Sequence, residues 1–105
     1  MSTTVYVVTV QGIDWYHLLP VVHLRYETAL AAWNEARLAL IRDQREYIAR
    51  HKRNLRTETH PDFVQIHTND IAECEAEILR LSDPNPATCD PTDKWPTIEK
   101  MELMP

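Results

Sequence analysis

Four side chains of types that coordinate zinc occur within residues 60–74, and their spacing is the first test of a metal site. They are His60, His67, Asp70 and Cys74. Two ligands of one zinc ion usually lie three or four residues apart on a helix, whereas His67 and Cys74 would be about 10 Å apart along the axis. Cys74 also falls on an apolar stripe, which is typical of a small core residue. The spacing therefore predicts no metal site.

An acid, two aromatic rings and an imidazole follow one another at Asp14, Trp15, Tyr16 and His17. Buried aromatic side chains anchor many protein interfaces, and loops carry many binding residues. An Asp near a His can also transfer protons, but no nucleophile or second carboxylate accompanies this pair. Packing within a β-hairpin, contact with a partner and catalysis all remain open. Trp15, Tyr16 and His17 are candidate partner-binding residues, and we assign no catalytic residue.

Basic side chains gather in residues 37–56, which contain Arg37, Arg42, Arg45, Arg50, Lys52, Arg53 and Arg56. With two acids, this segment carries +5, whereas residues 1–36 carry −2 and residues 57–105 carry −8, for a net charge of −5. A basic helix can bind nucleic-acid phosphates or an acidic protein, or it can be a solvated surface neutralised by an acidic helix beside it. Nucleic acid is the less favoured partner, because only Tyr47 offers a stacking ring among the arginines and no helix-turn-helix pattern is visible.

The acidic segment from Glu58 to Asp93 has two interpretations. It can mimic the charge of nucleic acid and occupy a basic groove of another protein, or it can be ordinary solvated surface. From the two charged segments together, the candidate partner-binding residues are Arg42, Arg45, Arg50, Arg53, Glu73 and Glu77.

The elements that would position these residues follow from the apolar periodicity. Thr4–Val10 is β-branched or aromatic throughout and is apolar on both faces, which predicts a central strand. A second strand follows over residues 19–26, so residues 4–26 form a β-hairpin. Residues 28–55 and 61–82 form two helices, with Thr28 as N-cap and Pro61 at the first helical position of the second. A proline-rich connector, 83–94, leads to a last strand at 95–104.

These elements predict an α+β fold in a single domain, residues 1–105: a small three-stranded, mainly antiparallel sheet with a long antiparallel helical hairpin inserted before the last strand. The expected contact stripe of the first helix is Leu30, Trp33, Arg37, Leu40 or Ile41, Gln44, Ile48, His51 and Leu55. That of the second helix is Phe63, Ile66, Ile71, Cys74, Ile78 and Leu81.

Composition excludes several classes of protein. No stretch approaches the ~20 apolar residues that cross a bilayer, and the first residues lack the features of a signal peptide, so we expect a cytoplasmic protein without a membrane partner. Two cysteines, Cys74 and Cys89, form no disulfide framework, and reduced thiols are expected. A chain with one glycine cannot form a Gly-rich phosphate loop, so we expect no cofactor and no enzyme.

Several residues resemble a family of short uncharacterised bacteriophage proteins that open with a Tyr-Val-Val-Thr strand. The matching positions are Tyr6–Thr9, Gly12, Asp14, Tyr16–His17, Val21–Val22, Thr28 and the closing run Ile98–Leu103. The resemblance implies a small three-stranded sheet with a helical layer and an origin in a phage or other mobile element. It implies no activity. Residues 37–82 depart from the family pattern as an insertion, which makes the hairpin the expected functional part.

The leading hypothesis is a non-enzymatic phage or mobile-element accessory protein that binds a host or phage protein stoichiometrically, for example to inhibit a host defence or DNA-handling system. It would act in the host cytoplasm. One alternative is nucleic-acid binding through the basic half of the first helix. The other is a structural homodimer, formed through the open sheet face or through a four-helix bundle of Trp33, Leu40, Ile48, Phe63 and Ile71.

Overall fold

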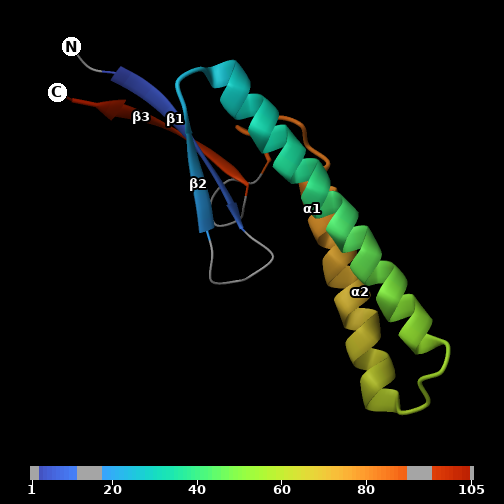
Figure 1. Cartoon of the computed structure of the whole chain (residues 1–105). Helices are drawn as coiled ribbons and strands as arrows, with labels where there is room; N and C mark the ends of the chain where they lie inside the picture. The colour runs from blue at the N-terminus through green and yellow to red at the C-terminus, as the bar shows by residue number, and fades with distance from the viewer. Residues whose placement is uncertain (1–2, 12–17, 90–95, 105) are drawn as a thin grey trace. The chain divides into compact units, whose positions relative to one another are not determined.

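The computed structural model describes residues 3–11, 18–89 and 96–104. In chain order its elements are β1 (Thr3–Gln11), β2 (Leu18–His23), α1 (Tyr26–Leu55), α2 (Pro61–Leu81) and β3 (Thr97–Leu103), as Figure 1 shows. The strands form one antiparallel sheet in the order β2-β1-β3. The α+β class, the three-stranded sheet and the helical hairpin between β2 and β3 are therefore confirmed.

The chain divides into two compact units. Unit 1 comprises Met1–Arg37 and Pro84–Pro105, and it contains the sheet and the first turns of α1. Unit 2 comprises Leu38–Asp83 and is the helical hairpin.

The start of α1 differs from the sequence prediction. The carbonyl of Arg25 accepts hydrogen bonds from Ala29 N at 3.2 Å and from Thr28 Oγ1 at 3.0 Å. Arg25 therefore precedes the helix, and Thr28 lies in its first turn rather than at the N-cap. β2 ends at His23, so its expected extension to Tyr26 is wrong. The apolar alternation of residues 19–26 extends beyond β2 because Tyr26, its last apolar residue, is already the first residue of α1.

The core of unit 1 forms where the first turns of α1 meet one face of β1. Val8, Ala29, Trp33 and Cys89 are buried together, and Trp33 is only 1% exposed. Trp33 Nε1 donates a hydrogen bond of 3.0 Å to the carbonyl of Pro96, the residue that precedes β3. The indole therefore joins α1 to the beginning of β3 while it packs on β1.

The opposite face of the sheet carries Val5, which is also buried. Its cross-strand neighbours on that face are more exposed: Val22 opposite Val7 is 60% exposed, and Met101 opposite Val5 is 46% exposed. β1 thus has a buried side chain on each face, as its sequence predicts, whereas the two edge strands leave apolar side chains in contact with solvent.

Arg37 belongs to the core of unit 1 and not to the basic surface. It is 7% exposed, its Nε and Nη2 donate to Asn34 Oδ1 at 3.1 and 2.6 Å, and its Cζ lies 5.8 Å from the Trp33 ring centroid. Its aliphatic stem and planar guanidinium cover the indole, as arginine often does for an aromatic ring.

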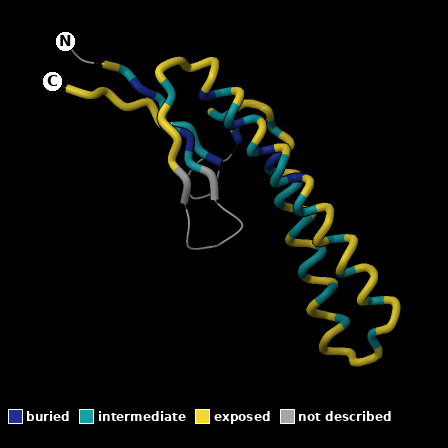
Figure 2. Tube along the Cα trace, viewed as in Figure 1, coloured by how far each residue is buried: buried dark blue, intermediate teal, exposed yellow. Residues whose placement is uncertain are grey.

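The helices of unit 2 contact each other at His51 and His67, and in both helices the less exposed residues recur at alternating spacings of three and four. Figure 2 colours the buried and half-buried segments along them. We define the contact stripe as the partly or fully buried residues Ile41, Gln44, Ile48, His51, Leu55, Val64, His67, Ile71, Cys74, Ile78 and Leu81. Phe63 and Ile66, which the sequence predicts on this stripe, are 52% and 50% exposed, so that part of the prediction is wrong. Val64 and His67 take their places. Neighbouring residues are only 100° apart around a helix, so periodicity alone leaves the facing column uncertain by one position.

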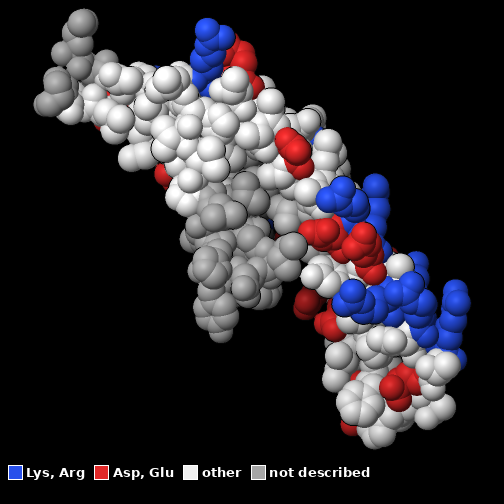
Figure 3. Space-filling model, viewed as in Figure 1, with Lys and Arg blue, Asp and Glu red and all other residues white. Residues whose placement is uncertain are grey.

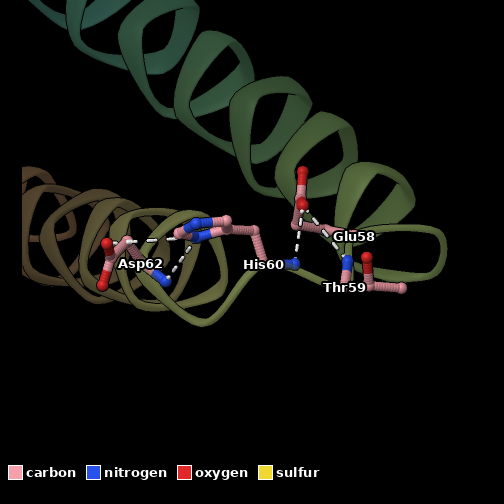
Figure 4. A network of polar contacts seen from close by, with 4 residues as sticks. All are labelled: Glu58, Thr59, His60 and Asp62. Atoms are coloured by element: carbon pink, nitrogen blue, oxygen red, sulfur yellow. Dashed lines mark hydrogen bonds and ion pairs between the residues drawn. The ribbon is translucent and has the colours of Figure 1, made fainter.

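The turn between the helices is held by hydrogen bonds that Figure 4 shows. Glu58 Oε1 accepts from the backbone N–H of Thr59 at 3.1 Å and of His60 at 3.0 Å. His60 is the N-cap of α2, and its Nδ1 accepts from Asp62 N at 3.2 Å. Pro61 follows at the first helical position, so α2 begins where the sequence predicts. Within the described ranges, neither helix combines the length and apolarity needed to span a membrane.

Candidate functional site

The contact stripe divides the exposed surface of unit 2 into two sides. A residue directly before a stripe residue is rotated by 100° one way around its helix, and a residue directly after it by 100° the other way. The helices run antiparallel and contact each other at His51 and His67. In this arrangement the preceding positions of both helices share one side of the hairpin, the leading side, and the following positions share the other, the trailing side.

The leading side exposes a group of large apolar side chains. We define the aromatic patch as Tyr47, Arg50, Phe63 and Ile66, each of which directly precedes a stripe residue. Tyr47, Phe63 and Ile66 are 44%, 52% and 50% exposed. The Arg50 Cζ lies 5.6 Å from the Tyr47 ring centroid, and the Phe63 ring lies 5.1 Å from that of His60. Tyr and Arg are among the residue types that contribute most to the binding energy of protein interfaces.

The trailing side carries most of the basic charge. We define the basic stripe as Arg42, Arg45, Lys52 and Arg56, all exposed and each directly following a stripe residue. From Arg42 to Lys52 it spans about 15 Å along α1, and Arg56 lies just beyond the end of the helix. On the face drawn in Figure 3, the Lys and Arg side chains of unit 2 gather over α1. Leu79 of α2, which is 77% exposed, lies on this same side.

The acidic residues of α2 do not neutralise these arginines. Between the helices, the described ion pair is His51 Nε2 with Asp70 Oδ2 at 3.8 Å. Arg80, also on α2, forms an ion pair with Glu77 at 2.9 Å between Nη2 and Oε2. None of the arginines at positions 42, 45, 50, 53 and 56 forms an ion pair with an acid in the part of the chain that the structure describes. Their charge is therefore available to a partner.

The structure separates the predicted partner-binding residues. Arg42 and Arg45 lie on the trailing side, whereas Arg50 and Glu73 lie on the leading side. Arg53 falls between the two sides, on the face of α1 directed away from α2.

Two groups of predicted residues need separate comment. Glu77 lies on the leading side, but it is half-buried and paired with Arg80, so it offers a partner less than the exposed Glu73 does. Trp15, Tyr16 and His17 lie outside the described residues. Of the five residues expected in a four-helix bundle, only Phe63 is exposed; Trp33 is enclosed in unit 1, and Leu40, Ile48 and Ile71 are partly buried.

A polar pair interrupts the contact stripe near the turn. His51 Nδ1 and His67 Nδ1 are 2.9 Å apart, with ring centroids 5.1 Å apart. One Nδ1 must donate and the other accept, so this contact contains a single proton. Asp70 approaches the other nitrogen of His51, so the three side chains do not converge on one point. Elsewhere in the described ranges, too, no group of three His, Cys, Asp or Glu side chains is placed to hold a metal ion.

Sequence reasoning missed the histidine pair because it compared His67 with Cys74 on the same helix. The detectable signal was that His51 falls on the expected stripe of the first helix. Cys74 is a stripe residue, as predicted, and it is partly buried. Burial and then the charge of Asp70 raise the pKa of the Cys74 thiol, which keeps it protonated and unreactive.

A shallow hollow of about 290 Å³ lies in unit 1, lined by Tyr6, Tyr26, Pro86, Ala87, Ile98 and Lys100. The Tyr6 and Tyr26 rings meet edge to face, with centroids 5.4 Å apart and planes at 64°. These six residues supply aromatic and aliphatic surface with one ammonium group. They suit contact with an apolar group better than acid–base catalysis.

Comparison with protein-family models, with curated proteins and with solved structures finds no match to this chain.

Proposed function

We propose that this chain is a non-enzymatic binding protein whose helical hairpin docks on another protein and occludes it. The observation that carries the proposal is the aromatic patch: Tyr47, Phe63 and Ile66 remain about half exposed on one side of the hairpin, and Arg50 lies over the Tyr47 ring. Exposed apolar groups of this size mark interaction sites when they are contiguous and bordered by polar residues. Glu73, on the same side, supplies a charge of opposite sign to Arg50.

The partner is a host or phage protein in the cytoplasm of a bacterial cell. This part of the proposal rests on the resemblance of the strands to those of short phage proteins. A two-helix surface with both signs of charge suits stoichiometric blocking of a groove or helix on another protein. Inhibition of a host defence or DNA-handling system is a role that such occlusion would serve.

Affinity capture from a lysate of the natural cell, with mass spectrometry as the readout, tests this proposal. The tagged wild-type chain should retain one protein stoichiometrically, with or without nuclease. Ile66→Asp places a charge in the aromatic patch and should weaken that binding at least about tenfold. The matched control is Leu79→Asp, which makes the same change at a more exposed leucine on the trailing side and should bind as wild type. Equal retention by both variants would contradict the proposal.

The basic stripe favours a second candidate, binding of a nucleic-acid backbone. Arg42, Arg45, Lys52 and Arg56 are exposed and form no ion pair with a described acid. If all four contact phosphates, log K should fall with log[salt] with a slope of about −3 to −4. The double variant Arg42→Glu with Arg45→Glu should no longer bind nucleic acid. The Ile66→Asp variant should bind it as tightly as wild type does. Retention that survives nuclease and changes little with salt would eliminate this candidate.

A further inference from the structure

The outer edge of β3 has no strand partner among the described residues of unit 1. β3 pairs with β1 along one edge, and no described residue pairs with its other edge. An unpaired edge presents backbone N–H and C=O groups that can bind another strand. The edge formed by β2 contains Pro20, which lacks the N–H needed for a continuous ladder, whereas β3 contains no proline over its seven residues.

Apolar side chains on the β3 edge are left in solvent. Met101, Leu103 and Met104 are 46%, 53% and 78% exposed. Met104 lies just beyond the end of β3. Lys100 and Glu102, both exposed, lie on the opposite face of the strand from Met101 and Leu103, and the exposed Glu99 shares the face of Met101. Charges normally protect an edge strand because they would face like charges or apolar groups in a second strand. The sequence of β3 allows one arrangement in which Lys100 and Glu102 face each other, with Glu99 as the one charge that faces an apolar side chain.

We propose that a second copy of this chain pairs with β3 in antiparallel orientation, about a two-fold axis that passes through Met101. Self-pairing centred on Glu99, Lys100 or Glu102 would place two like charges directly opposite each other. Centred on Met101, it places Lys100 opposite Glu102 of the second copy, twice, Ile98 opposite the second copy's Met104, and Glu99 opposite its Leu103. Met101 then packs against Met101 of the second copy. The result is a continuous six-stranded sheet.

This inference does not depend on the proposed function of the hairpin. The two surfaces belong to different units, so a dimer formed by β3 can present two copies of the hairpin surface to partners. The occupant of the β3 edge is a copy of the chain because the segment Lys100–Glu102 carries opposite charges on either side of Met101 and is therefore complementary to itself in the reverse direction.

A charge swap, read by analytical ultracentrifugation, tests the register. The wild-type chain should sediment at twice its mass of 12.3 kDa and dissociate on dilution. Lys100→Glu or Glu102→Lys alone creates two like-charge pairs and should raise the dissociation constant at least about tenfold. The double variant exchanges both charges, restores both pairs and should return the dissociation constant to within about threefold of wild type.

A cysteine placed on the axis tests the same geometry by distance. In Met101→Cys the two introduced residues face each other at about 5 Å between Cβ atoms, within reach of a disulfide under mild oxidation. In the control Leu103→Cys, the two cysteines are about 13 Å apart along the sheet and should not cross-link. The wild-type chain, whose own cysteines Cys74 and Cys89 are half-buried and buried, should give no cross-linked dimer.

The proposal is overturned if the wild-type chain has the mass of one copy at every concentration. It is also overturned if the charge-swapped double variant dimerises as weakly as the single variants. Equal yields of cross-linked dimer from Leu103→Cys and Met101→Cys would overturn it too. Circular dichroism should show that all these variants fold like wild type, since the substituted side chains are exposed. A dimer that Ile66→Asp dissociates and Lys100→Glu does not would place self-association on the hairpin and refute the β3 interface.

Discussion

Replacing Trp33 tests whether one side chain holds unit 1 together. The indole is 1% exposed, packs against Val8 and donates to the carbonyl of Pro96 at 3.0 Å. Trp33→Phe keeps an aromatic ring but removes the donor, which leaves a buried carbonyl without this hydrogen bond. The cost of an unpaired buried acceptor is about 1–3 kcal/mol. Trp33→Ala also opens a cavity, which costs about 3–5 kcal/mol.

These costs are a large fraction of the total stability of a small domain, which is about 5–15 kcal/mol. For a loss of about 2 kcal/mol, Trp33→Phe should lower Tm by about 8–16 °C. Urea unfolding followed by far-ultraviolet circular dichroism measures the free energy, and amide hydrogen exchange of β3 shows where protection is lost. Trp33→Ala should largely remove the protection of β3, because Pro96 is no longer bound to α1.

Glu35→Gln, an exposed change on the same turns of α1, is the matched control and should stay within about 0.5 kcal/mol of wild type. A Trp33→Phe variant as stable as this control would refute the stabilising role of the indole N–H. The same role would be refuted if the amides of β3 in Trp33→Ala were as protected from hydrogen exchange as in wild type, because the hydrogen bond to Pro96 would then not stabilise the strand.

Two further predictions concern the contact stripe of the hairpin. His51→Leu and His67→Leu should each cost about 1–3 kcal/mol, because each leaves a partly buried imidazole nitrogen without its partner. The double variant should cost less than the sum, as measured by urea unfolding, and strict additivity would show that the 2.9 Å contact contributes nothing. Burial and the charge of Asp70 raise the pKa of the Cys74 thiol, so the folded chain keeps this proton when the unfolded chain has lost it. Stability should therefore fall as pH rises above the ordinary cysteine pKa of about 8.5, and Cys74→Ala should reduce the fall; an unchanged pH profile in that variant would contradict this cause.

Much of the fold follows from local chemistry in the sequence. The β-branched run Thr4–Val10 forms β1, and Pro61 with its preceding turn residues marks the beginning of α2. The errors lie where two local patterns overlap. The alternation of residues 19–26 continued past His23 into the first turn of α1, because an apolar residue at Tyr26 fits both a strand and a helix. Local patterns do not decide such a boundary, which depends on the carbonyl of Arg25 becoming the first acceptor of the helix.

The candidate site was less predictable than the fold. The sequence identified a charged helical hairpin, but it placed Phe63 and Ile66 on the contact stripe, where the structure exposes them. It placed Arg37 both among the basic side chains and on the contact stripe of the first helix; the buried position is confirmed, and there the side chain covers Trp33. The errors at Phe63 and Ile66 are a rotation about the axis of α2. A repeat of three and four residues is shared by neighbouring columns of a helix, and only packing against a second helix selects one of them.

The sequence by itself determined the class of fold, the order of its elements and the concentration of basic charge in α1, since these depend on backbone preference, apolar periodicity and composition. Tertiary structure alone decided which side of the hairpin each charged residue occupies and that His51 meets His67. It alone also decided that the arginines of α1 form no ion pair with the described acids of α2. These facts depend on the rotation and register of one element against another, which are set by contacts between residues far apart in the chain.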